Sequence, residues 1–461
     1  MAKLLSLALV LALVGQAVEA ANKYPVVLVH GLMGWNTGEF LNVPYWGTLQ
    51  GNFPEKLRAE GYTVYTVGVG KLSSDWDRAC DLYSQIKGGR VDYGPNHSKV
   101  NGHGRYGRNY TGLFPDWGTV VNGKLQKIHL MGHSMGGTTI RMLAQMLNKG
   151  VANALTPEDP SAHPLFAGGK DWVHSITTIS TPNLGSTLAN MLTVDPDIIE
   201  TVAAAAFSLI GALGDTTKSL FDPVMDQWGI ANKASGESLK DYFKRVSKSK
   251  LFAPGFHDNA GFSLTTKGAD AQAGWVTTLP NVYYYSFVSD ATFSWRDPLL
   301  RKIALPDLRF ASPFTAPLAT LMGSRATSAF GFSDDWLRND GFVNIVSQPS
   351  DGIAPVIDFA GKSKRGTWVT FKPLAMDHLG MMGSNPLIPV YSLYKAHFAL
   401  VSDLPAHEQL TQKQRALRAD TEEAAIETGE HEAPLSLVLD MFAAQVPLAV
   451  EYKEPPKGPQ Q

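Results

Sequence analysis

Residues 128–137, IHLMGHSMGG, join an apolar run to a Gly-x-Ser-x-Gly motif and a glycine pair. The run KIHLM has the composition of a buried strand, and GGTTIRMLAQMLNKG, which follows, carries apolar residues at helical spacing. A serine on a sharp turn between a strand and a helix is the setting of a nucleophile elbow. Side chains at positions 132 and 136 would collide with the neighbouring strand and helix, which explains both glycines. The motif alone also occurs in plain turns, but this context favours Ser134 as a nucleophile.

The same strand pattern recurs on both sides of this motif. YPVVLVHGLMGW and GYTVYTVGVG precede it, separated by GTLQGNFPEKLRAEG, a stretch of helical length. WVHSITTISTP, VYYYSFVSD and GTWVTFKPLA follow it as further strands. Strands that alternate with helices predict an α/β fold with a mostly parallel central sheet and helices on both faces.

Composition narrows the class of protein. Charged residues make up 18% of the 461 residues and the formal net charge is −2, so there is no electrostatic reason to expect nucleic acid or an acidic partner. Cys80 is the single cysteine, which excludes a disulfide within the chain.

The two ends of the chain differ from the middle. Lys3 precedes the apolar run LLSLALVLALVG, and Val18-Glu19-Ala20 fits a small-x-small cleavage site. We therefore expect residues 1–20 to be a signal peptide cleaved near Ala20 and the protein to be secreted, because the apolar run is shorter than the about 20 residues that span a membrane. Residues 402–461 are first charged and then apolar with polar interruptions, and we expect an extension of unknown role without a transmembrane segment. The catalytic domain would then be residues 21–401.

A serine nucleophile needs a base and an acid downstream, in the order serine, acid, histidine. His378, in LAMDHLGMMG, follows a late strand and is the favoured base. Asp340, in RNDGFVN, precedes a glycine turn and is only slightly favoured over the other aspartates. The oxyanion would be bound by the backbone N–H groups of Met135, after the serine, and Leu32, in the early HGL motif. Other histidines after the serine remain open as bases: His163, His174, His257, His397, His407 and His431.

A second group of polar residues lies in the long connection at residues 74–117. It contains Asp77, His97 and His103, which are ligand types that zinc accepts, and Asp226 in FDPVMDQWG would supply a fourth ligand. Spacing alone does not predict zinc, because two loop histidines six residues apart are more often solvated.

Several segments taken together resemble the zinc-containing thermoalkalophilic bacterial lipases, which are secreted triacylglycerol hydrolases with an α/β-hydrolase fold. These segments are VHGLMGW, YWG, SSDWDRACDLYSQIKGGRVDYG, GHGRYGR, HSMGG, MDQWG, NDGFVN and DHLG, and the resemblance covers roughly residues 23–400. It implies Ser134 as the nucleophile, Asp340 as the acid and His378 as the base, with Leu32 and Met135 as the oxyanion donors.

The resemblance also implies a metal and a lid. The zinc ligands would be Asp77, His97, His103 and Asp226, and four protein ligands imply a structural zinc in an insertion at about residues 74–117. The lid would lie at about residues 195–245, where IIETVAAAAFSLIGAL is too apolar to lie open in water, although a core helix is the alternative.

The sequence departs from this family at its calcium site and at the elbow. Gly380 and Asn385 stand where the family has acidic calcium ligands, so we expect calcium to be weak or absent. Gly132 and Met135 replace an alanine and a glutamine, which should not abolish chemistry because the oxyanion donor is a backbone N–H.

The predicted function is that of a secreted triacylglycerol lipase that acts through an acyl-serine on triglyceride, or another lipid ester, at an oil–water interface. A phospholipase, an acyltransferase or a short-chain carboxylesterase would use the same elbow, and these remain alternatives. A hydrolase fold that only binds ligands is less consistent with a sequence that contains serine, aspartate and histidine at suitable positions.

Overall fold

A computed structural model describes residues 21–36, 38–39, 42–194, 222–253, 255–406, 429–444 and 446–449. A seven-stranded sheet lies at its centre, with the order β13-β15-β9-β8-β7-β1-β2 and parallel pairing throughout. Its strands are β1 (Val26–Val29), β2 (Val64–Val67), β7 (Ile128–His133), β8 (Val173–Ile179), β9 (Tyr283–Phe287), β13 (Val356–Asp358) and β15 (Trp368–Thr370). The six apolar runs assigned to strands from the sequence all contribute a strand to this sheet.

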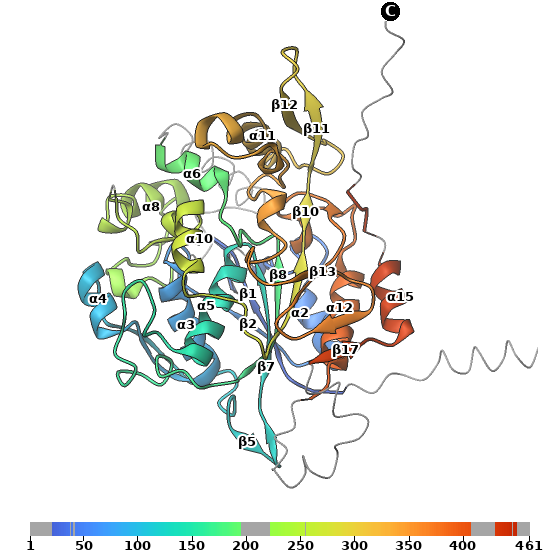
Figure 1. The fold of residues 1–461 in the computed structure, drawn as a ribbon. Coiled ribbons are helices and arrows are strands. Elements are labelled where there is room, and N and C mark those ends of the chain that lie inside the picture. Colours follow the sequence, from blue (N-terminus) through green and yellow to red (C-terminus); the bar gives the residue numbers. More distant parts are fainter. Residues whose placement is uncertain are drawn as a thin grey trace, which may run out of the picture.

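Helices cover both faces of the sheet (Figure 1). On one side α3 (Asp75–Lys87) packs against α5 (Met135–Lys149), and on the other lie α2 (Phe53–Ala59) and α12 (Tyr391–Asp403). Strand β1 is buried along its whole length because alternate residues enter two different hydrophobic clusters, Val27 and Val29 in one and Val26 and Leu28 in the other. This is how a parallel sheet covered on both faces is stabilised, and the arrangement fits the predicted α/β-hydrolase fold.

The carboxyl end of the sheet carries additional elements (Figure 1). α6 (Thr187–Val194) follows β8. Beyond β9 and the short β10 (Ser289–Asp290), the chain forms the hairpin β11 (Thr292–Arg296) and β12 (Lys302–Pro306) and then α11 (Ala316–Phe330). α11 packs on both β12 and α6. Because Ser134 directly follows β7, the predicted nucleophile lies at this same end of the sheet.

The region at residues 74–117, which the sequence suggested to be a loop, is largely regular. It contains α3, β3 (Gly89–Asp92), α4 (Pro95–Asn101) and β4 (Tyr106–Tyr110), which pairs with β3. The Ser74 side chain accepts the Asp77 N–H and so caps α3, and Pro95 occupies the first turn of α4. Asp77 and His97 are therefore held on helices.

Several predictions fall partly or wholly outside the described residues. The signal peptide (1–20) and much of the lid (195–221) lie outside them, and the described remainder of the lid region contains α8 (Leu239–Val246). Part of the predicted C-terminal extension packs against the body: β17 (Glu430–Glu432) pairs with β14 (Lys362–Lys364), and α15 (Leu435–Ala443) packs on α12. Within the described parts of the chain, no helix has the length and apolarity to cross a membrane.

The remaining regular elements are short. They are β5 (Val120–Val121), β6 (Lys124–Leu125), α9 (Ala260–Ser263), α10 (Thr266–Ala273), β16 (Leu374–Ala375) and the 3₁₀ turns Asp226–Trp228, Lys250–Phe252, Asp334–Trp336, Ile345–Ser347 and Gly380–Met382.

Candidate active site and metal cluster

The turn between β7 and α5 has the strained geometry of a nucleophile elbow. Ser134 has φ 56° and ψ −130°, a conformation that non-glycine residues rarely adopt. A Cβ on Gly132 would lie 2.4 Å from the backbone of Gly136, and a Cβ on Gly136 would lie 2.2 Å from the carbonyl oxygen of Val29. Both glycines are therefore required for the turn to pass between strand and helix, as the sequence indicated.

The structure brings His378 and Asp340 into direct contact. The His378 ring Nδ1 lies 2.9 Å from Asp340 Oδ2, and both side chains are buried. The other carboxylate oxygen of Asp340 accepts the N–H groups of Phe342 (3.0 Å) and Val343 (2.8 Å). Because Nδ1 donates to the carboxylate, Nε2 of the imidazole is left as a proton acceptor.

His133, the residue before Ser134, connects the elbow to this pair. Its ring centroid lies 4.8 Å from that of His378, and its Nε2 lies 2.9 Å from the His378 carbonyl oxygen. Burial, with a smaller contribution from the charge of His378, holds the pKa of His133 well below its ordinary value. A neutral His133 donates from Nε2 to the carbonyl and accepts at Nδ1.

Tyr45 extends this connection to the loop after β1. Its hydroxyl lies 2.7 Å from His133 Nδ1 and accepts the Gly31 N–H at 2.9 Å. Burial raises the pKa of the Tyr45 hydroxyl, so it stays protonated and donates to His133. A continuous hydrogen-bond path therefore runs from Gly31 through Tyr45 and His133 to the backbone of His378. Sequence reasoning assigned no role to Tyr45 or His133, although YWG and HSMGG were both noted.

The loop after β1 lies directly on the serine. A Cβ on Gly31 would be 2.7 Å from the Ser134 Cβ, so the backbone just before Leu32 lies against the nucleophile. Met135, which follows the serine, begins α5. The buried Arg78 donates to the His30 carbonyl (2.5 Å) and to the Gly70 carbonyl (2.9 Å), which holds the loop in place.

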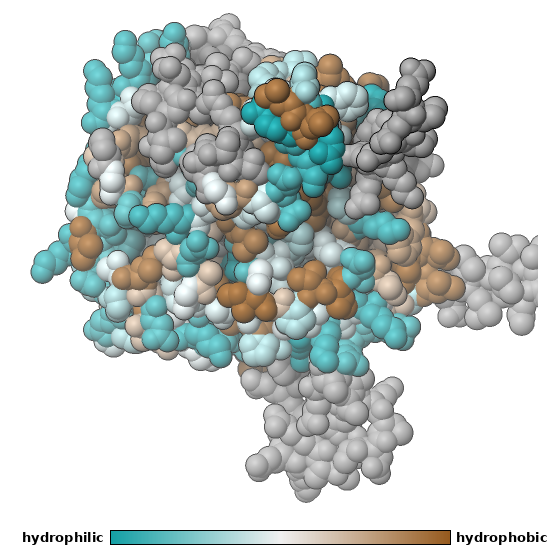
Figure 2. Space-filling view, turned by 45° about the horizontal axis from the view of Figure 1, so that its top comes forward, coloured by the Kyte–Doolittle hydropathy of each residue, from teal (hydrophilic) through white to brown (hydrophobic). Residues whose placement is uncertain are grey.

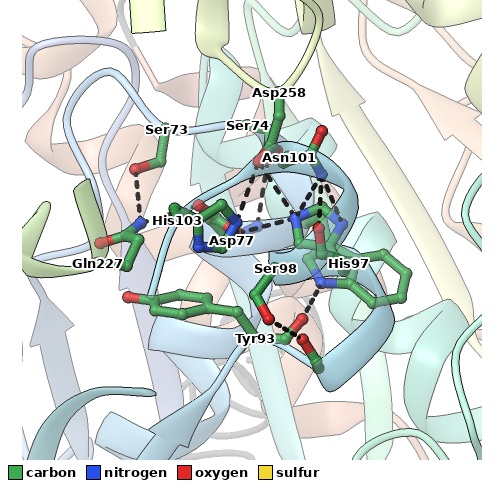
Figure 3. A network of polar contacts seen from close by, with 12 residues as sticks. Ser73, Ser74, Asp77, Tyr93, His97, Ser98, Asn101, His103, Gln227 and Asp258 are labelled. Carbon is green, nitrogen blue, oxygen red and sulfur yellow. Dashed lines mark hydrogen bonds and ion pairs between the residues drawn. The ribbon is translucent and has the colours of Figure 1, made fainter. Parts of the chain in front are cut away.

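A second cluster of titratable side chains lies among α3, α4 and the segment before α9 (Figure 3). One nitrogen or oxygen atom from each of Asp77, His97, His103 and Asp258 lies within 4.8 Å of every other. His97 Nε2 is 3.2 Å from both carboxylates, and His103 Nε2 is 3.3 Å from Asp258 Oδ2. Two imidazoles and two carboxylates form a donor set suited to zinc.

The hydrogen-bond arrangement supports this interpretation. Apart from the ion-pair contacts just given, Asp77 Oδ1, His103 Nε2 and Asp258 Oδ2 are buried with no hydrogen-bond partner, and a bound cation would satisfy them. The Nδ1–H of His103 donates to the Gly104 carbonyl (2.9 Å), and Gln227 donates to the second oxygen of Asp77 (2.8 Å). These contacts orient the remaining lone pairs toward a common point, as outer partners of metal ligands do.

Electrostatics at the cluster favour a cation. Burial lowers the pKa of His97, but hydrogen bonds and charge from Asp258 and Asp77 more than offset that effect and raise the pKa to about 10. Burial likewise lowers the pKa of His103, yet Asp258 and Asp77 give a net increase. The two carboxylates therefore attract positive charge into a buried site, which a divalent cation can supply.

The prediction that Asp226 is the fourth ligand is corrected by the structure. Asp226 lies in an ion pair with Arg108, its side chain is 48% exposed, and Asp258 occupies the fourth place of the cluster. The MDQWG segment still approaches the site, but through Gln227 and through Trp228, whose ring centroid is 4.6 Å from that of His103. Asp258, in GFHDNAG, was missed because a single aspartate before a short helix has no local signal for metal binding.

The positions expected to lack calcium ligands lie just after His378. A Cβ on Gly380 would lie 2.9 Å from the Met376 Cβ, so a larger side chain there requires rearrangement. The adjacent Asp377 carboxylate already accepts hydrogen bonds from the backbone and from the Thr315 hydroxyl at 2.7 Å. Weak or absent calcium binding remains a prediction.

Comparisons with known proteins point to one family. A family model described as "Lipase-like, C-terminal domain" matches residues 22–415. Lipase 1 from Pelosinus fermentans is 39% identical with a TM-score of 0.71, over 85% of this chain and 100% of that one. EstA from Clostridium botulinum is 36% identical with a TM-score of 0.73, over 85% and 90% of the two chains. Lipase 2 of Staphylococcus aureus is 35% identical over 79% of this chain and 51% of its own length. The chain thus spans about half the length of such curated relatives.

Proposed function

The chain belongs to the lipase-like C-terminal domain family, and from this premise we propose that it is a serine lipase that hydrolyses the carboxylic esters of triacylglycerol. The observation that supports this most directly is Ser134 at positive φ on the turn after β7, one residue from a histidine whose ring contacts the His378–Asp340 pair. Relatives named lipase agree with it.

The proposed mechanism assigns one step to each group. His378 takes the proton from the Ser134 hydroxyl as its oxygen attacks the ester carbonyl carbon, and Asp340 orients the resulting imidazolium. The backbone N–H groups of Leu32 and Met135 bind the oxyanion. The tetrahedral intermediate expels the alcohol, which receives the proton from His378, and leaves an acyl-serine. Water then repeats the sequence and releases the fatty acid.

We further propose that Asp77, His97, His103 and Asp258 hold a structural zinc ion. Bound there, zinc would cross-link segments distant in sequence and would have no open position for substrate, since the four protein ligands complete a tetrahedral shell. The three buried atoms without hydrogen-bond partners support this assignment. Secretion, with residues 1–20 as the signal peptide, and action at an oil–water interface beneath a lid within residues 195–245 are part of the same proposal.

The decisive experiment measures fatty-acid release from a triglyceride emulsion. We expect Ser134→Ala to remove nearly all turnover and Asp340→Asn to lower kcat by about 10⁴, the effect known when a triad histidine loses its orienting carboxylate. Parallel assays with a phospholipid, a short soluble ester and an added alcohol acceptor separate lipase from phospholipase, esterase and acyltransferase. An unaffected rate in Asp340→Asn would show that another residue is the acid, and no ester hydrolysis at all would contradict the proposed function.

A further inference from the structure

The hairpin β11–β12 projects from the carboxyl end of the sheet, beyond the helices that surround it (Figure 1). It continues directly from β9 and β10, so its base is part of the same framework as the candidate active site. It also rests closely on α11, because a Cβ on Gly323 would lie 2.0 Å from the Ala304 carbonyl oxygen. The hairpin is therefore a supported projection and not a loose loop.

The tip of this hairpin presents apolar side chains to water. Leu299 is 72% exposed and Leu300 is 73% exposed. Leu308 is 76% exposed but follows β12 at the base of the hairpin. Trp295 on β11 is 47% exposed. None of these side chains contributes to the hydrophobic core, so burial within the described parts of the chain does not explain them.

The turn that carries the two leucines is held in a strained form. Leu300 has φ 59°, which is unfavourable for a residue other than glycine. The Asp297 carboxylate accepts the N–H groups of Leu299 and Arg301, both at 2.9 Å, and the Asp297 carbonyl accepts the Leu300 N–H at 2.8 Å. The leucines are thus presented in a fixed geometry, so that little conformational entropy remains to be lost on binding.

Cationic side chains lie beside the apolar tip. Arg301 and Lys302 have 71% and 54% exposed side chains and pair with Asp297 and Asp334. Arg309, at the base of the hairpin, is 78% exposed and pairs with Asp307. Residues 295–310 contain four cations, including Arg296, and two carboxylates, so this segment has a net positive charge in a chain whose overall formal charge is −2. Figure 2 looks toward this end of the molecule and shows apolar side chains beside hydrophilic ones on its surface.

We propose that this hairpin tip anchors the protein to a lipid surface that carries fatty-acid carboxylates. The leucines would enter the acyl layer and the surrounding cations would lie at the level of the carboxylates, which is how apolar and basic groups combine at lipid interfaces. A projecting apolar tip with cations beside it suits such a surface better than a groove-shaped protein partner. The inference rests on the proposed function, because hydrolysis of the ester phase would itself produce these carboxylates.

The position of the anchor suits this role. The tip and Ser134 lie at the same end of the sheet, so docking would direct the nucleophile toward the lipid. α11 packs against α6 through Leu318 and Met322 with Leu188 and Met191. The hairpin is therefore linked through α11 to α6, the helix that follows β8.

Binding is tested apart from catalysis in full-length protein carrying Ser134→Ala. Partition onto phosphatidylcholine vesicles, with and without added oleate, is measured by co-sedimentation. Adding Leu299→Ser and Leu300→Ser should lower the partition coefficient at least about tenfold, because two buried leucine side chains are lost from the acyl layer. Leu155→Ser is the matched control, since Leu155 is 63% exposed but lies in the connection from α5 to β8, at the opposite end of the sheet.

The charge component has its own test. Arg301→Gln with Lys302→Gln, the two cations next to the leucines, should remove most of the preference for oleate-containing vesicles and most of the sensitivity of that preference to salt. Equal partition of the leucine variant and the Leu155→Ser control, or no binding of the parent protein to either vesicle, would overturn the proposal. With the native Ser134 restored, the leucine variant should hydrolyse a short soluble ester at the unchanged rate. If no protein with Ser134 hydrolyses that ester, the proposed function is contradicted but the anchor is not.

Discussion

Tyr45 occupies the position at which three parts of the candidate active site meet. Its hydroxyl accepts the Gly31 N–H and donates to His133, which in turn donates to the His378 carbonyl. Each of these groups is buried, and a buried polar group that loses its partner carries its full desolvation cost. We therefore infer that Tyr45 is a positioning residue for the oxyanion loop and the base, although it touches none of the reacting atoms.

Tyr45→Phe should reduce kcat by a factor of about 5 to 100, which corresponds to the about 1–3 kcal/mol expected when a buried hydrogen-bond partner is removed. KM should change little, since the hydroxyl is buried between the Gly31 N–H and His133. Steady-state kinetics on a soluble ester check both values. Tyr391→Phe removes a hydroxyl that bonds Glu60 at the surface (2.9 Å) and is the control; equal kinetics in the two variants would argue against positioning by Tyr45.

At the scale of elements, the proposed zinc site joins parts of the chain that no strand pairing connects. α3 carries Asp77, α4 carries His97, and Asp258 precedes α9. A metal at this point would tie the segment around Asp258 to α3 and α4. Bound metal stabilises the folded state because the unfolded chain does not assemble the ligands.

Asp258→Asn should therefore lower the zinc content well below the one ion per chain expected of the native protein and should lower Tm by several degrees. Asp226→Asn should do neither, because it removes only a partly exposed ion pair with Arg108. Elemental analysis after gel filtration and thermal unfolding, each with and without a chelator, measure the two effects. Loss of zinc in Asp226→Asn with retention in Asp258→Asn would restore the original prediction from the sequence.

For the molecule as a whole, buried histidines should lower the free energy of unfolding in acid. Burial lowers the pKa of His397 to about 3, and burial with a smaller contribution from His397 lowers that of His129 to about 3. His397 lies 2.7 Å from the Thr177 hydroxyl, and His129 lies 2.7 Å from the Ser175 hydroxyl. The unfolded chain binds these protons near pH 6.5, whereas the folded protein does not.

The free energy of unfolding should consequently fall as the pH drops from about 6.5 toward about 3, by up to about 1.4 kcal/mol per pH unit for each such histidine. His397→Gln should have a shallower dependence on pH than the native protein, even if its stability near neutral pH is lower. Urea unfolding across this range provides the slopes. Parallel curves for the two proteins would contradict the assignment to His397.

Features that depend on neighbouring residues could be predicted from the amino-acid sequence. The apolar runs predict six strands of the sheet because strand formation and burial follow a local pattern. The strand, turn and helix around Ser134 predict the elbow in the same way, and the clash that requires Gly132 is with Gly136, four residues away. The lipase family was also identified from short motifs, and the family comparison confirms it.

Contacts between residues far apart in the chain depend on the three-dimensional fold. The sequence indicated Asp226 and gave no signal for Asp258, but Asp226 pairs with Arg108 while Asp258 belongs to the cluster. The path through Tyr45 joins residues 88 and 245 positions apart, and the exposure of Leu299 and Leu300 follows from the direction in which their hairpin leaves the sheet. Periodicity and motif spacing describe the chain over a few residues, whereas these contacts are set by the packing of whole elements against one another.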